Sequence, residues 1–422
     1  MPPAVAVSAV SPSGSARNAL ALTAVCLVAL MFGLEISSVP VILPTLEQQL
    51  GTGFQDAQWI MNAYTLACTS VLMAAGTLAD RFGRRRMLVL CLWLFGLASL
   101  ACGLAEDASL LITARFVQGV GAGAMMICQF AILSHQFREP AARARAFAVW
   151  GVIAGLGLGF GPMVGALILA VADWRWVFLV HVPLTLLTLV LLHVSVQESR
   201  DPASHRLDIA GMLTLTLSVF ALVYFITQGT ENGFGTPAML GWAGLSLAAL
   251  LLFSLIERRS AHPMFDFSVF RIQRFNGALM GSIGMNFSFW PFMIYLPLYF
   301  QAGLGYDTLT TGAALLAYTL PTLLVPPLAE RLALRYGAER IIPLGLGLMA
   351  AGFLAMAAVN AAEHPRIGLV LLSCVIAGVG LALTNSPTTN TTTGSVSADR
   401  AGMASGIDLS ARLITLALNI AL

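Results

Sequence analysis

Long apolar segments alternate with short polar segments along the whole chain. Each apolar segment is about twenty residues long, enough for an α-helix to cross roughly 30 Å of hydrocarbon at about 1.5 Å per residue. The apolar residues run continuously and do not alternate with polar ones, so a membrane β-barrel is excluded. We therefore predict an all-α polytopic membrane protein. The thirteen predicted spans are residues 19–43, 57–78, 87–104, 109–134, 145–170, 176–196, 208–228, 238–256, 276–302, 310–332, 341–361, 367–386 and 401–422.

Composition supports a lipid environment and excludes several classes of function. The 422 residues are 58% hydrophobic and 10% charged, against about 25% charged in an ordinary soluble domain. All 22 basic residues are arginine, which is typical of GC-rich bacterial genes, so we expect a bacterial plasma (inner) membrane. Without lysine there is no phosphate-binding loop, so ATP does not drive the chain directly. The six cysteines lie in apolar segments without metal-ligand spacing, so we expect no metal and no cofactor.

The distribution of arginine predicts the orientation in the membrane. If the N-terminus is cytoplasmic, the cytoplasmic segments contain eighteen arginines, the outer loops contain only Arg175 and Arg366, and two arginines lie within spans. Short cytoplasmic loops carry such an excess of positive charge. The first apolar segment is longer than the core of a signal peptide. We therefore predict a cytoplasmic tail over residues 1–18 and a retained first span.

The chain contains an internal repeat. The loop after the second span reads GTLADRFGRRRM (76–87), and the segment after the tenth reads PPLAERLALRYGAER (326–340), which places Asp80 and Glu330 250 residues apart. Omitting the seventh and eighth spans leaves about 200 residues, or six spans. We therefore predict a six-helix half over 19–196, two inserted helices within 197–257 and a second half over 258–422. That second half has five of six helices, so we expect a fourteen-span protein whose last helix is missing from this sequence.

Four local strings resemble the major facilitator superfamily, and in particular its fourteen-span drug:proton antiporters. They are GTLADRFGRRR after the second span (76–86), ARFVQGVGAGAM in the fourth (114–125), GLGLGFGPMVGALI in the fifth (155–168) and LEISSVPVILP in the first (34–44). The resemblance implies two six-helix halves with the substrate site between them. It also implies a gating role for Gly76, Asp80, Arg81, Gly83, Arg84 and Arg85.

Two of these strings have alternative interpretations. The arginines of the 76–86 loop either only hold the loop in the cytoplasm, or form with Asp80 a latch that closes the cytoplasmic side against the thirteenth span near Asp399 and Arg400. The glycines of the fifth span either only permit close packing, or form a bendable seam between the halves, as in antiporters. The candidate residues of this antiporter helix are Gly157, Gly161, Pro162 and Gly165.

Away from the ends of the predicted spans only four charged residues lie within them, and each costs a few kcal/mol unless it is paired or hydrated. Glu35 lies about 12 Å from the outer end of its span and Arg115 about 9 Å from the same face. We therefore predict that they face one cavity, either as a proton-coupling pair or as a static ion pair, and Gln118 is a further candidate residue of this cavity. The other two, Asp408 and Arg412, are four residues apart and suited to a local ion pair or a second protonatable site.

Polar and aromatic residues give weaker indications. Asn286, Trp290 and Tyr295 in the ninth span are candidates for a pocket that holds a flat amphipathic molecule, although interfacial belts have the same composition. We expect residues 385–394 to form a helix end and a cytoplasmic loop. His181 stands where the family usually has asparagine, and we interpret it as structural or interfacial.

The predicted function is proton-coupled export of small amphipathic compounds or drugs by alternating access, with a proton gradient as the energy source. The alternative is export of one endogenous metabolite, lipid or amino acid. A membrane enzyme would require clustered nucleophiles or metal ligands; the sequence has none, so we predict no enzyme. A sensor would add a soluble domain, which the sequence also lacks. The expected partners are a small-molecule substrate, protons and the lipid bilayer, with no nucleic acid, and we expect a monomer.

Overall fold

The structure is a computed structural model that describes residues 12–51, 53–137, 139–199, 209–259, 267–361, 366–396 and 401–421. Within these ranges the chain is helical and contains no strand. The helices are α1 (Pro12–Leu50), α2 (Phe54–Phe82), α3 (Arg84–Gly103), α4 (Ala108–Gln136), α5 (Pro140–Val171), α6 (Arg175–Leu179), α7 (His181–Ser195), α8 (Ile209–Asn232), α9 (Pro237–Arg259), η1 (Phe267–Arg271), α10 (Gln273–Leu298), η2 (Tyr299–Gly303), α11 (Thr308–Leu324), α12 (Pro326–Tyr336), α13 (Ala338–Asn360), α14 (Ile367–Gly394) and α15 (Ala401–Ala421). The predicted fold class is therefore confirmed.

Each predicted span overlaps helical structure, but several boundaries were wrong. The first span was predicted over 19–43, whereas α1 covers Pro12–Leu50, and the twelfth was predicted to end at residue 386, whereas α14 ends at Gly394. Both helices continue into polar sequence because helical hydrogen bonds do not depend on apolar side chains. In the part of the chain that the structure describes, nine helices are long and apolar enough to cross a membrane, and a tenth span results if α11 and α12 are counted together.

Prolines divide two of the predicted spans into pairs of helices. Pro183 has no N–H to donate to the carbonyl of Leu179, where α6 ends. Pro326 and Pro327 begin α12, which is bent by 46° from α11. At the other end of α11, Asp307 accepts a hydrogen bond from the backbone N–H of Thr310 at 2.6 Å. The Thr310 amide and then its hydroxyl hold the pKa of the Asp307 carboxyl below its ordinary value.

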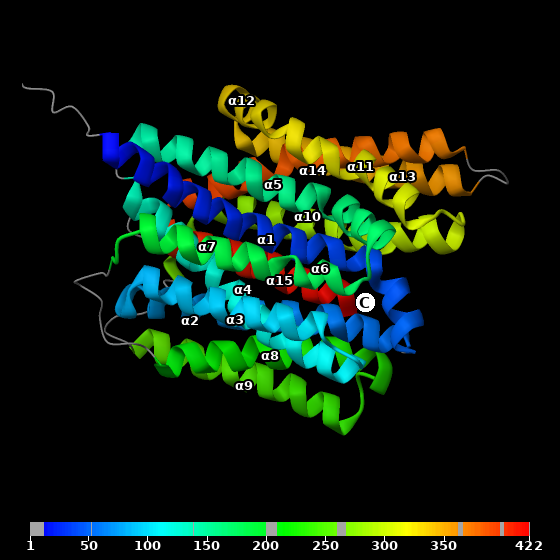
Figure 1. Cartoon of the computed structure of the whole chain (residues 1–422), viewed down its shortest axis with the longest axis horizontal. Helices are drawn as coiled ribbons and strands as arrows, with labels where there is room; N and C mark the ends of the chain where they lie inside the picture. The colour runs from blue at the N-terminus through cyan, green and yellow to red at the C-terminus, as the bar shows by residue number, and fades with distance from the viewer. Residues whose placement is uncertain are drawn as a thin grey trace, which may run out of the picture.

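The long helices lie side by side, with α8 and α9 along one edge and α11 to α14 toward the opposite edge (Figure 1). Helices α4, α5 and α7 pack against α1, and α13 packs on α14. Across the predicted halves, α5 packs on α11 and α2 packs on α15. The helix pair α8–α9 packs through α8 against both α2 and α15. The division at residues 196 and 258 stays a prediction.

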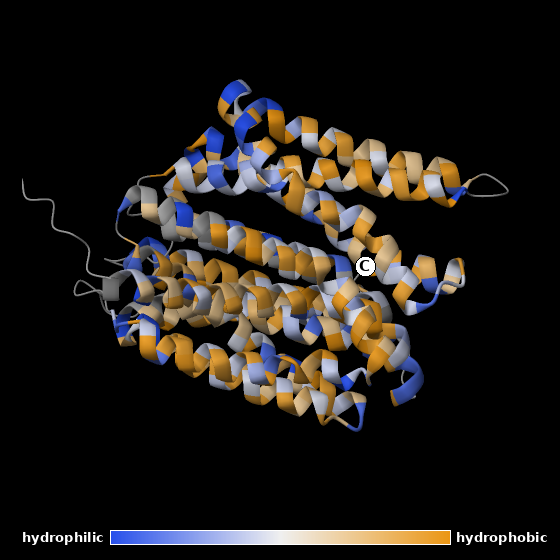
Figure 2. Ribbon diagram, turned by 45° about the horizontal axis from the view of Figure 1, so that its top comes forward, coloured by the Kyte–Doolittle hydropathy of each residue, from blue (hydrophilic) through white to orange (hydrophobic). Residues whose placement is uncertain are grey.

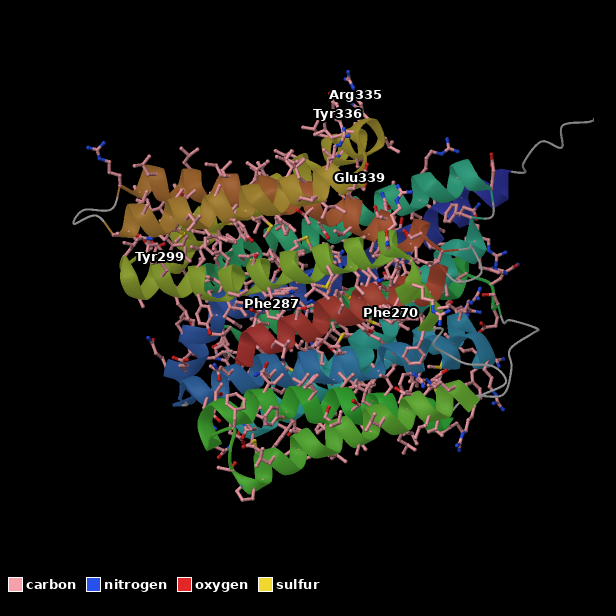
Figure 3. All side chains as sticks on the ribbon, turned by 180° about the vertical axis from the view of Figure 1, so that it is seen from behind. Phe270, Phe287, Tyr299, Arg335, Tyr336 and Glu339 are labelled. Carbon is pink, nitrogen blue, oxygen red and sulfur yellow. The ribbon has the colours of Figure 1, made fainter. Side chains whose placement is uncertain are left out.

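The outer surface of the bundle is apolar along the length of the helices and hydrophilic near their ends (Figure 2). On α3 the exposed side chains include Leu90, Trp93, Leu97 and Leu100, which follow one face of a helix. Charged groups instead lie at turns, such as Arg335 and Glu339 on either side of the turn between α12 and α13 (Figure 3). This arrangement suits a bundle whose lateral surface faces lipid, and the chain is a multi-pass membrane protein.

The repeat has a structural counterpart, with one difference. Gly83 joins α2 to α3 with φ of +110°, and Gly337 joins α12 to α13 with φ of +90°, a conformation that favours glycine. These glycines are 254 residues apart, whereas Asp80 and Glu330 are 250 apart. The second copy therefore has four additional residues, about one helical turn, between its acidic residue and its glycine.

Candidate functional site

The structure brings Glu35 of α1 and Arg115 of α4 together inside the bundle. Their side chains are 0% and 2% exposed, and an Arg115 Nη1–H donates to Glu35 Oε1. Arg115 Nη1 also donates to Gln118 Oε1 at 2.7 Å, and Arg115 Nε donates to the carbonyl of Ile60 on α2 at 3.0 Å. The guanidinium thus connects three helices. A buried charge costs much less when it is paired and hydrogen-bonded in this way.

Aromatic rings complete the surroundings of Arg115. Its Cζ lies 4.2 Å from the ring centroid of Tyr64 and 5.7 Å from that of Phe178. Both distances are within the range of a cation–π interaction, which is stronger in a desolvated site. Gln118 continues the hydrogen-bonded network, since its Nε2 donates to Ser99 Oγ on α3 at 2.9 Å. Gln118, a candidate residue of the predicted cavity, therefore lies beside Arg115 in the structure.

His181 is a member of this site that the sequence interpretation missed. It is buried at the start of α7, and its Nδ1 lies 3.2 Å from Glu35 Oε2. The sequence contained one usable signal. His181 follows Arg175, at the outer end of its span, by six residues, and Arg115 also lies about six residues from the outer end of α4. The depths of His181, Arg115 and Glu35 therefore agree, but depth does not show which faces of the helices meet.

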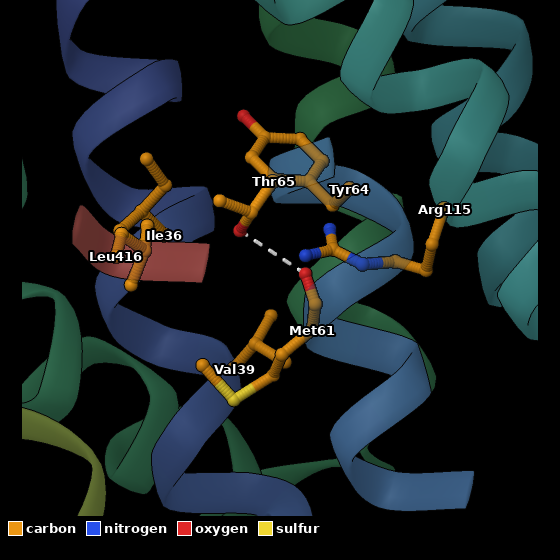
Figure 4. A pocket seen from close by; sticks show the side chains of 7 residues that line it. All are labelled: Ile36, Val39, Met61, Tyr64, Thr65, Arg115 and Leu416. Carbon is orange, nitrogen blue, oxygen red and sulfur yellow. Dashed lines mark hydrogen bonds between the residues drawn. The ribbon is translucent and has the colours of Figure 1, made fainter. Parts of the chain in front are cut away.

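A small cavity adjoins the buried pair at the boundary between the predicted halves (Figure 4). Its volume is about 10 Å³, roughly the space that one water molecule needs. Arg115 lines one side of it, and Leu416 on α15 reaches it from the second half. The other lining residues are Ile36, Val39, Met61, Tyr64 and Thr65. The cavity therefore lies between the two predicted halves, and it is nearly closed in this conformation.

Three of the glycines of α5 lie against α1, as the close-packing alternative describes, and the seam between the halves stays a prediction. A Cβ added to Gly157 would lie 2.8 Å from the carbonyl oxygen of Leu30, and one added to Gly161 would overlap Ser37 Oγ. Gly165 lies similarly close to Ser38 of α1. Gly157, Gly161 and Gly165 therefore form a close contact within the first half. Pro162 is also buried in α5. Between the halves, the α5–α11 contact instead involves Gly159, opposite Thr319.

The loop after α2 is attached to the segment that follows α7. Glu198 accepts hydrogen bonds from the backbone N–H groups of Arg85 at 3.1 Å and Arg86 at 3.0 Å, at the N-terminus of α3. A carboxylate is favoured there by the unpaired amides and the helix dipole. The backbone N–H of Arg84 donates to Ser199 O at 3.0 Å. Glu198 also lies so close to Gly83 that an added Cβ would be 2.6 Å from its carboxyl carbon.

The predicted latch partner is not among these contacts. Asp399 and Arg400 lie outside the described residues, as does the side chain of Asp80, and the surroundings of Gly76 are not described either. Arg81 is exposed at the end of α2, with its Cζ 5.8 Å from the ring of Phe82. The latch against the thirteenth span therefore stays a prediction. What the structure contains is an attachment of the loop within the first half, through Glu198.

The second pair of charges forms a separate cluster on α15 and α14. Arg412 Nε donates to Asp408 Oδ2 at 2.9 Å, and Asp408 is buried. The same guanidinium donates to Asn385 Oδ1 at 2.5 Å and to the hydroxyls of Thr388 and Thr389 at 3.2 and 2.9 Å. Residues 385–394 were expected to form a helix end and a cytoplasmic loop; they form the end of α14, which continues to Gly394, so the loop part of the expectation was wrong. Threonines at these positions bond to backbone carbonyls one turn earlier, which keeps them compatible with a helix.

The aromatic residues of α10 do not form one pocket. Trp290 Nε1 donates to Asn286 Oδ1 at 3.0 Å, and both side chains are buried. Tyr295 is 38% exposed, and five residues along a helix it points to a different face from Trp290. Asn286 and Trp290 thus belong to the interior near α15, where Asn419 Nδ2 lies 3.5 Å from Asn286 O. Tyr295 belongs to the outer surface.

Comparison with known proteins places this arrangement in a family context. The family model described as Major Facilitator Superfamily matches residues 25–418. The chain is 34% identical over 395 residues to the multidrug resistance protein Stp of Mycobacterium tuberculosis, covering 94% of this chain and 73% of that protein. It is 31% identical over 396 residues to the puromycin resistance protein pur8 of Streptomyces alboniger, covering 93% and 78%. A D-xylose–proton symporter structure superposes with a TM-score of 0.68 at 17% identity over 95% of this chain and 88% of that one, which is a likeness of fold.

Proposed function

The chain belongs to the major facilitator superfamily of membrane transporters, and we propose that it exports small amphipathic compounds in exchange for protons by alternating access. Two similar proteins are named for resistance to drugs, one of them to puromycin. The structure contributes a buried, hydrogen-bonded pair of charges beside a cavity between the predicted halves. That pair is the observation on which the proposal rests.

The pair provides a way for a proton and a substrate to exclude each other. While Glu35 is ionised, its charge balances that of Arg115 through the bond between Oε1 and Nη1. When Glu35 binds a proton, the positive charge of Arg115 is no longer balanced, and Arg115 lines the cavity. A cationic amphipathic substrate is then repelled from the cavity and released. Binding of one species thus disfavours the other, which is the thermodynamic requirement for exchange.

The cavity must enlarge for transport to occur. Its volume is about 10 Å³, whereas sites for drug-sized molecules are roughly 300–1,000 Å³. The cavity is bounded by α1, α2 and α4 on one side and by Leu416 of α15 on the other. A displacement of α15 relative to α1 and α2 opens it. The present conformation therefore corresponds to a closed intermediate in the transport cycle, with the substrate site collapsed.

The remaining properties follow from the same proposal. The chain acts in a bacterial plasma membrane as a monomer, with its N-terminus in the cytoplasm, where the arginine-rich loops also lie. It uses no cofactor and draws its energy from the proton gradient. An ionisable group within a span is the usual mark of such a pathway.

Everted membrane vesicles test the proposal. Respiration acidifies the vesicle interior, and we expect vesicles that contain the protein to accumulate puromycin and ethidium until an uncoupler removes the gradient. Glu35→Gln should remove the gradient-driven accumulation, because glutamine cannot exchange a proton. Glu47→Gln, on the outer part of the same helix, should retain it. Undiminished uncoupler-sensitive accumulation in Glu35→Gln would exclude Glu35 from coupling.

Export of a single compound is the second candidate, because a similar protein is named for resistance to one antibiotic. The two candidates differ in the range of resistance that expression confers on a sensitive host. An exporter of broad specificity raises the inhibitory concentrations of several chemically unrelated compounds. A dedicated exporter raises that of one compound or of none in the panel.

A further inference from the structure

His181 lies among hydrogen-bond acceptors at the centre of the first half. Its Nε2 is 3.3 Å from the carbonyl oxygen of Met31 on α1. Its Nδ1 is 3.1 Å from the carbonyl oxygen of Val177 and 3.2 Å from Glu35 Oε2. The ring of Phe95 packs edge-on against the imidazole at 5.5 Å between centroids. The histidine is buried here, so bulk water does not reach it.

These contacts do not suit a neutral imidazole beside an ionised carboxylate. A neutral imidazole has one N–H and one nitrogen that only accepts. With the hydrogen on Nε2, the bond to Met31 O is made, but Nδ1 faces two oxygens without a hydrogen between them. With the hydrogen on Nδ1, the Nε2 and Met31 O face each other instead. Either tautomer leaves at least one buried contact between two acceptors, which is unfavourable.

One additional proton relieves this conflict. If it resides on the imidazole, both nitrogens donate and all three oxygens accept. If it resides on Glu35 Oε2, that hydroxyl donates to Nδ1 and Nε2–H still donates to Met31 O, so that only the contact between Nδ1 and Val177 O still joins two acceptors. Without this proton, Glu35 Oε2 is a buried oxygen that has no hydrogen-bond partner among the described residues. Arg115 Nη1–H donates to the other carboxylate oxygen, Oε1. Binding forms one N–H or O–H bond with a proton from water, release returns that proton to water, and no oxidant or reductant is needed.

We propose that Glu35 and His181 form a single proton-binding site, in which one exchangeable proton lies between Glu35 Oε2 and His181 Nδ1. The proposal rests on the proposed function, and it assigns the coupling proton to a pair of residues on two helices. His181 then binds that proton directly, through Nδ1. Arg115 is the fixed charge beside the site, held by bonds to α2 and α4 that do not involve His181.

Few other titratable groups face this pair. Among the described residues, they are Arg115 on α4, Tyr64 and Cys68 on α2, and Cys102 on α3. Tyr64 lies with its ring against the guanidinium, and Cys102 Sγ is 3.8 Å from Gln118 Oε1. The hydrogen bonds of Arg115 go to Glu35 Oε1, Gln118 and Ile60 rather than to Glu35 Oε2. The pH response of the pair is therefore expected to depend mainly on its two members and on the constant charge of Arg115.

Proton release has a structural consequence across two helices. It leaves acceptors facing each other between α1, which carries Met31 and Glu35, and the α6–α7 break, which carries Val177 and His181. This repulsion favours separation of the two elements. Because Ile36 and Val39 of α1 line the cavity, a movement of α1 changes the wall of the proposed substrate site. The proton is thus linked to the cavity through α1.

The first test is infrared difference spectroscopy of the purified full chain in lipid, between pH 5 and 9. We expect a band of protonated carboxyl that changes with pH in the wild type and is absent in Glu35→Gln. In His181→Asn the midpoint of this band should move by about one pH unit or more, which is the effect of a single strong partner. His135→Asn, about twenty residues beyond Arg115 at the other end of α4, should match the wild type.

The second test measures ethidium accumulation in everted vesicles with and without a pH gradient. We expect the increase in ethidium accumulation that the gradient causes to be at least about tenfold smaller in His181→Asn than in the wild type. In His135→Asn this increase should be unchanged. Asparagine keeps a donor near the Nδ1 position, and His181→Gln places the amide nearer the Nε2 position. The two variants together separate loss of the proton from loss of folding, which size-exclusion chromatography and thermal unfolding monitor.

The outcomes distinguish this inference from the proposed function. A band midpoint and a gradient dependence that are unchanged in both His181 variants would overturn the inference and leave proton-coupled export standing. The absence of any pH-dependent carboxyl, carboxylate or imidazole band that is lost in Glu35→Gln would also overturn it. If the band behaves as expected and the wild type shows no gradient-driven accumulation, the proton site stands and the proposed transport mechanism fails.

Discussion

Arg115 makes more contacts than a charge alone requires. Its guanidinium donates to Glu35 Oε1, to Gln118 Oε1 and to the Ile60 carbonyl, and it lies against the ring of Tyr64. These partners come from α1, α2 and α4, so their bonds fix the position of the guanidinium as well as its charge. A lysine has the same charge but a single ammonium group, without the planar arrangement of donors.

We therefore expect Arg115→Lys to impair transport although the net charge is unchanged. The variant loses one or two hydrogen bonds that involve a charged group, each worth about 1.5–3 kcal/mol. Gradient-driven ethidium accumulation in everted vesicles should fall at least about tenfold. Arg175→Lys, at the exposed end of α6, is the matched control and should keep its activity. Full activity in Arg115→Lys would mean that charge alone is sufficient at this position.

At the scale of helices, the contact between α1 and α5 is the closest that the glycines create around the site. An added Cβ on Gly33 would lie 2.7 Å from the backbone nitrogen of Leu158 on α5. Ser37 Oγ donates to Gly33 O at 2.7 Å and lies 3.1 Å from Gly157 O across the contact. Small residues permit such an approach, and in lipid it is van der Waals packing and hydrogen bonds that hold helices together. Because Glu35 lies on α1 between these residues, the contact also positions the acid.

Gly161→Ala should test the tolerance of this contact. The new methyl group would overlap Ser37 Oγ and would lie 2.9 Å from Ser37 Cβ, and overpacking of this kind costs about 1–3 kcal/mol. We expect a lower melting temperature in detergent and reduced transport. The additional change Ser37→Gly should restore part of the stability.

Gly155→Ala is the control on the same helix, since nothing lies within 4 Å of its added Cβ. Alanine also has a better helix propensity than glycine, by about 1 kcal/mol. This variant should therefore be as stable as the wild type or more stable. Equal losses in both variants would show that helix flexibility, and not the close contact with α1, is what the glycines provide.

At the scale of the whole molecule, the two predicted halves meet along α5–α11 and α2–α15, and α8 covers the second of these contacts. The cavity lies between them, with Arg115 on one side and Leu416 on the other. The Glu35 site lies toward the predicted outer face, and the attachment of the α2–α3 turn by Glu198 lies at the predicted cytoplasmic face. The proposed proton site and the attachment of the α2–α3 turn thus lie near opposite ends of the molecule.

The predicted orientation can be measured with single cysteines. The six native cysteines are buried, so they should not react with a membrane-impermeant thiol reagent. Gly53→Cys, in the exposed turn after α1, should react in intact cells, because the arginine distribution places this turn outside. Glu139→Cys, in the exposed turn after α4, should react only in everted vesicles. The reverse pattern would require an external N-terminus.

The sequence by itself determined the properties that depend on position along the membrane normal. Apolar segments of about twenty residues identified the helices, because a helix must satisfy its own backbone in lipid. Residue number within a span gives depth, at about 1.5 Å per residue, and equal depth is what predicts the pairing of Glu35 with Arg115. The repeated string at 76–87 and 326–340 likewise indicated the family, and the family match confirmed it.

Only the tertiary structure decided which faces of the helices meet. His181 contacts Glu35, Glu198 caps α3, Arg412 reaches Thr388 and Thr389, and Gly161 lies against Ser37. None of these pairings is visible in the pattern of hydrophobic residues, because lipid is as apolar as the interior and a continuous apolar span has no marked inner face. Lateral position is determined by the fit of side chains between neighbouring helices, and that fit exists only once the helices have assembled.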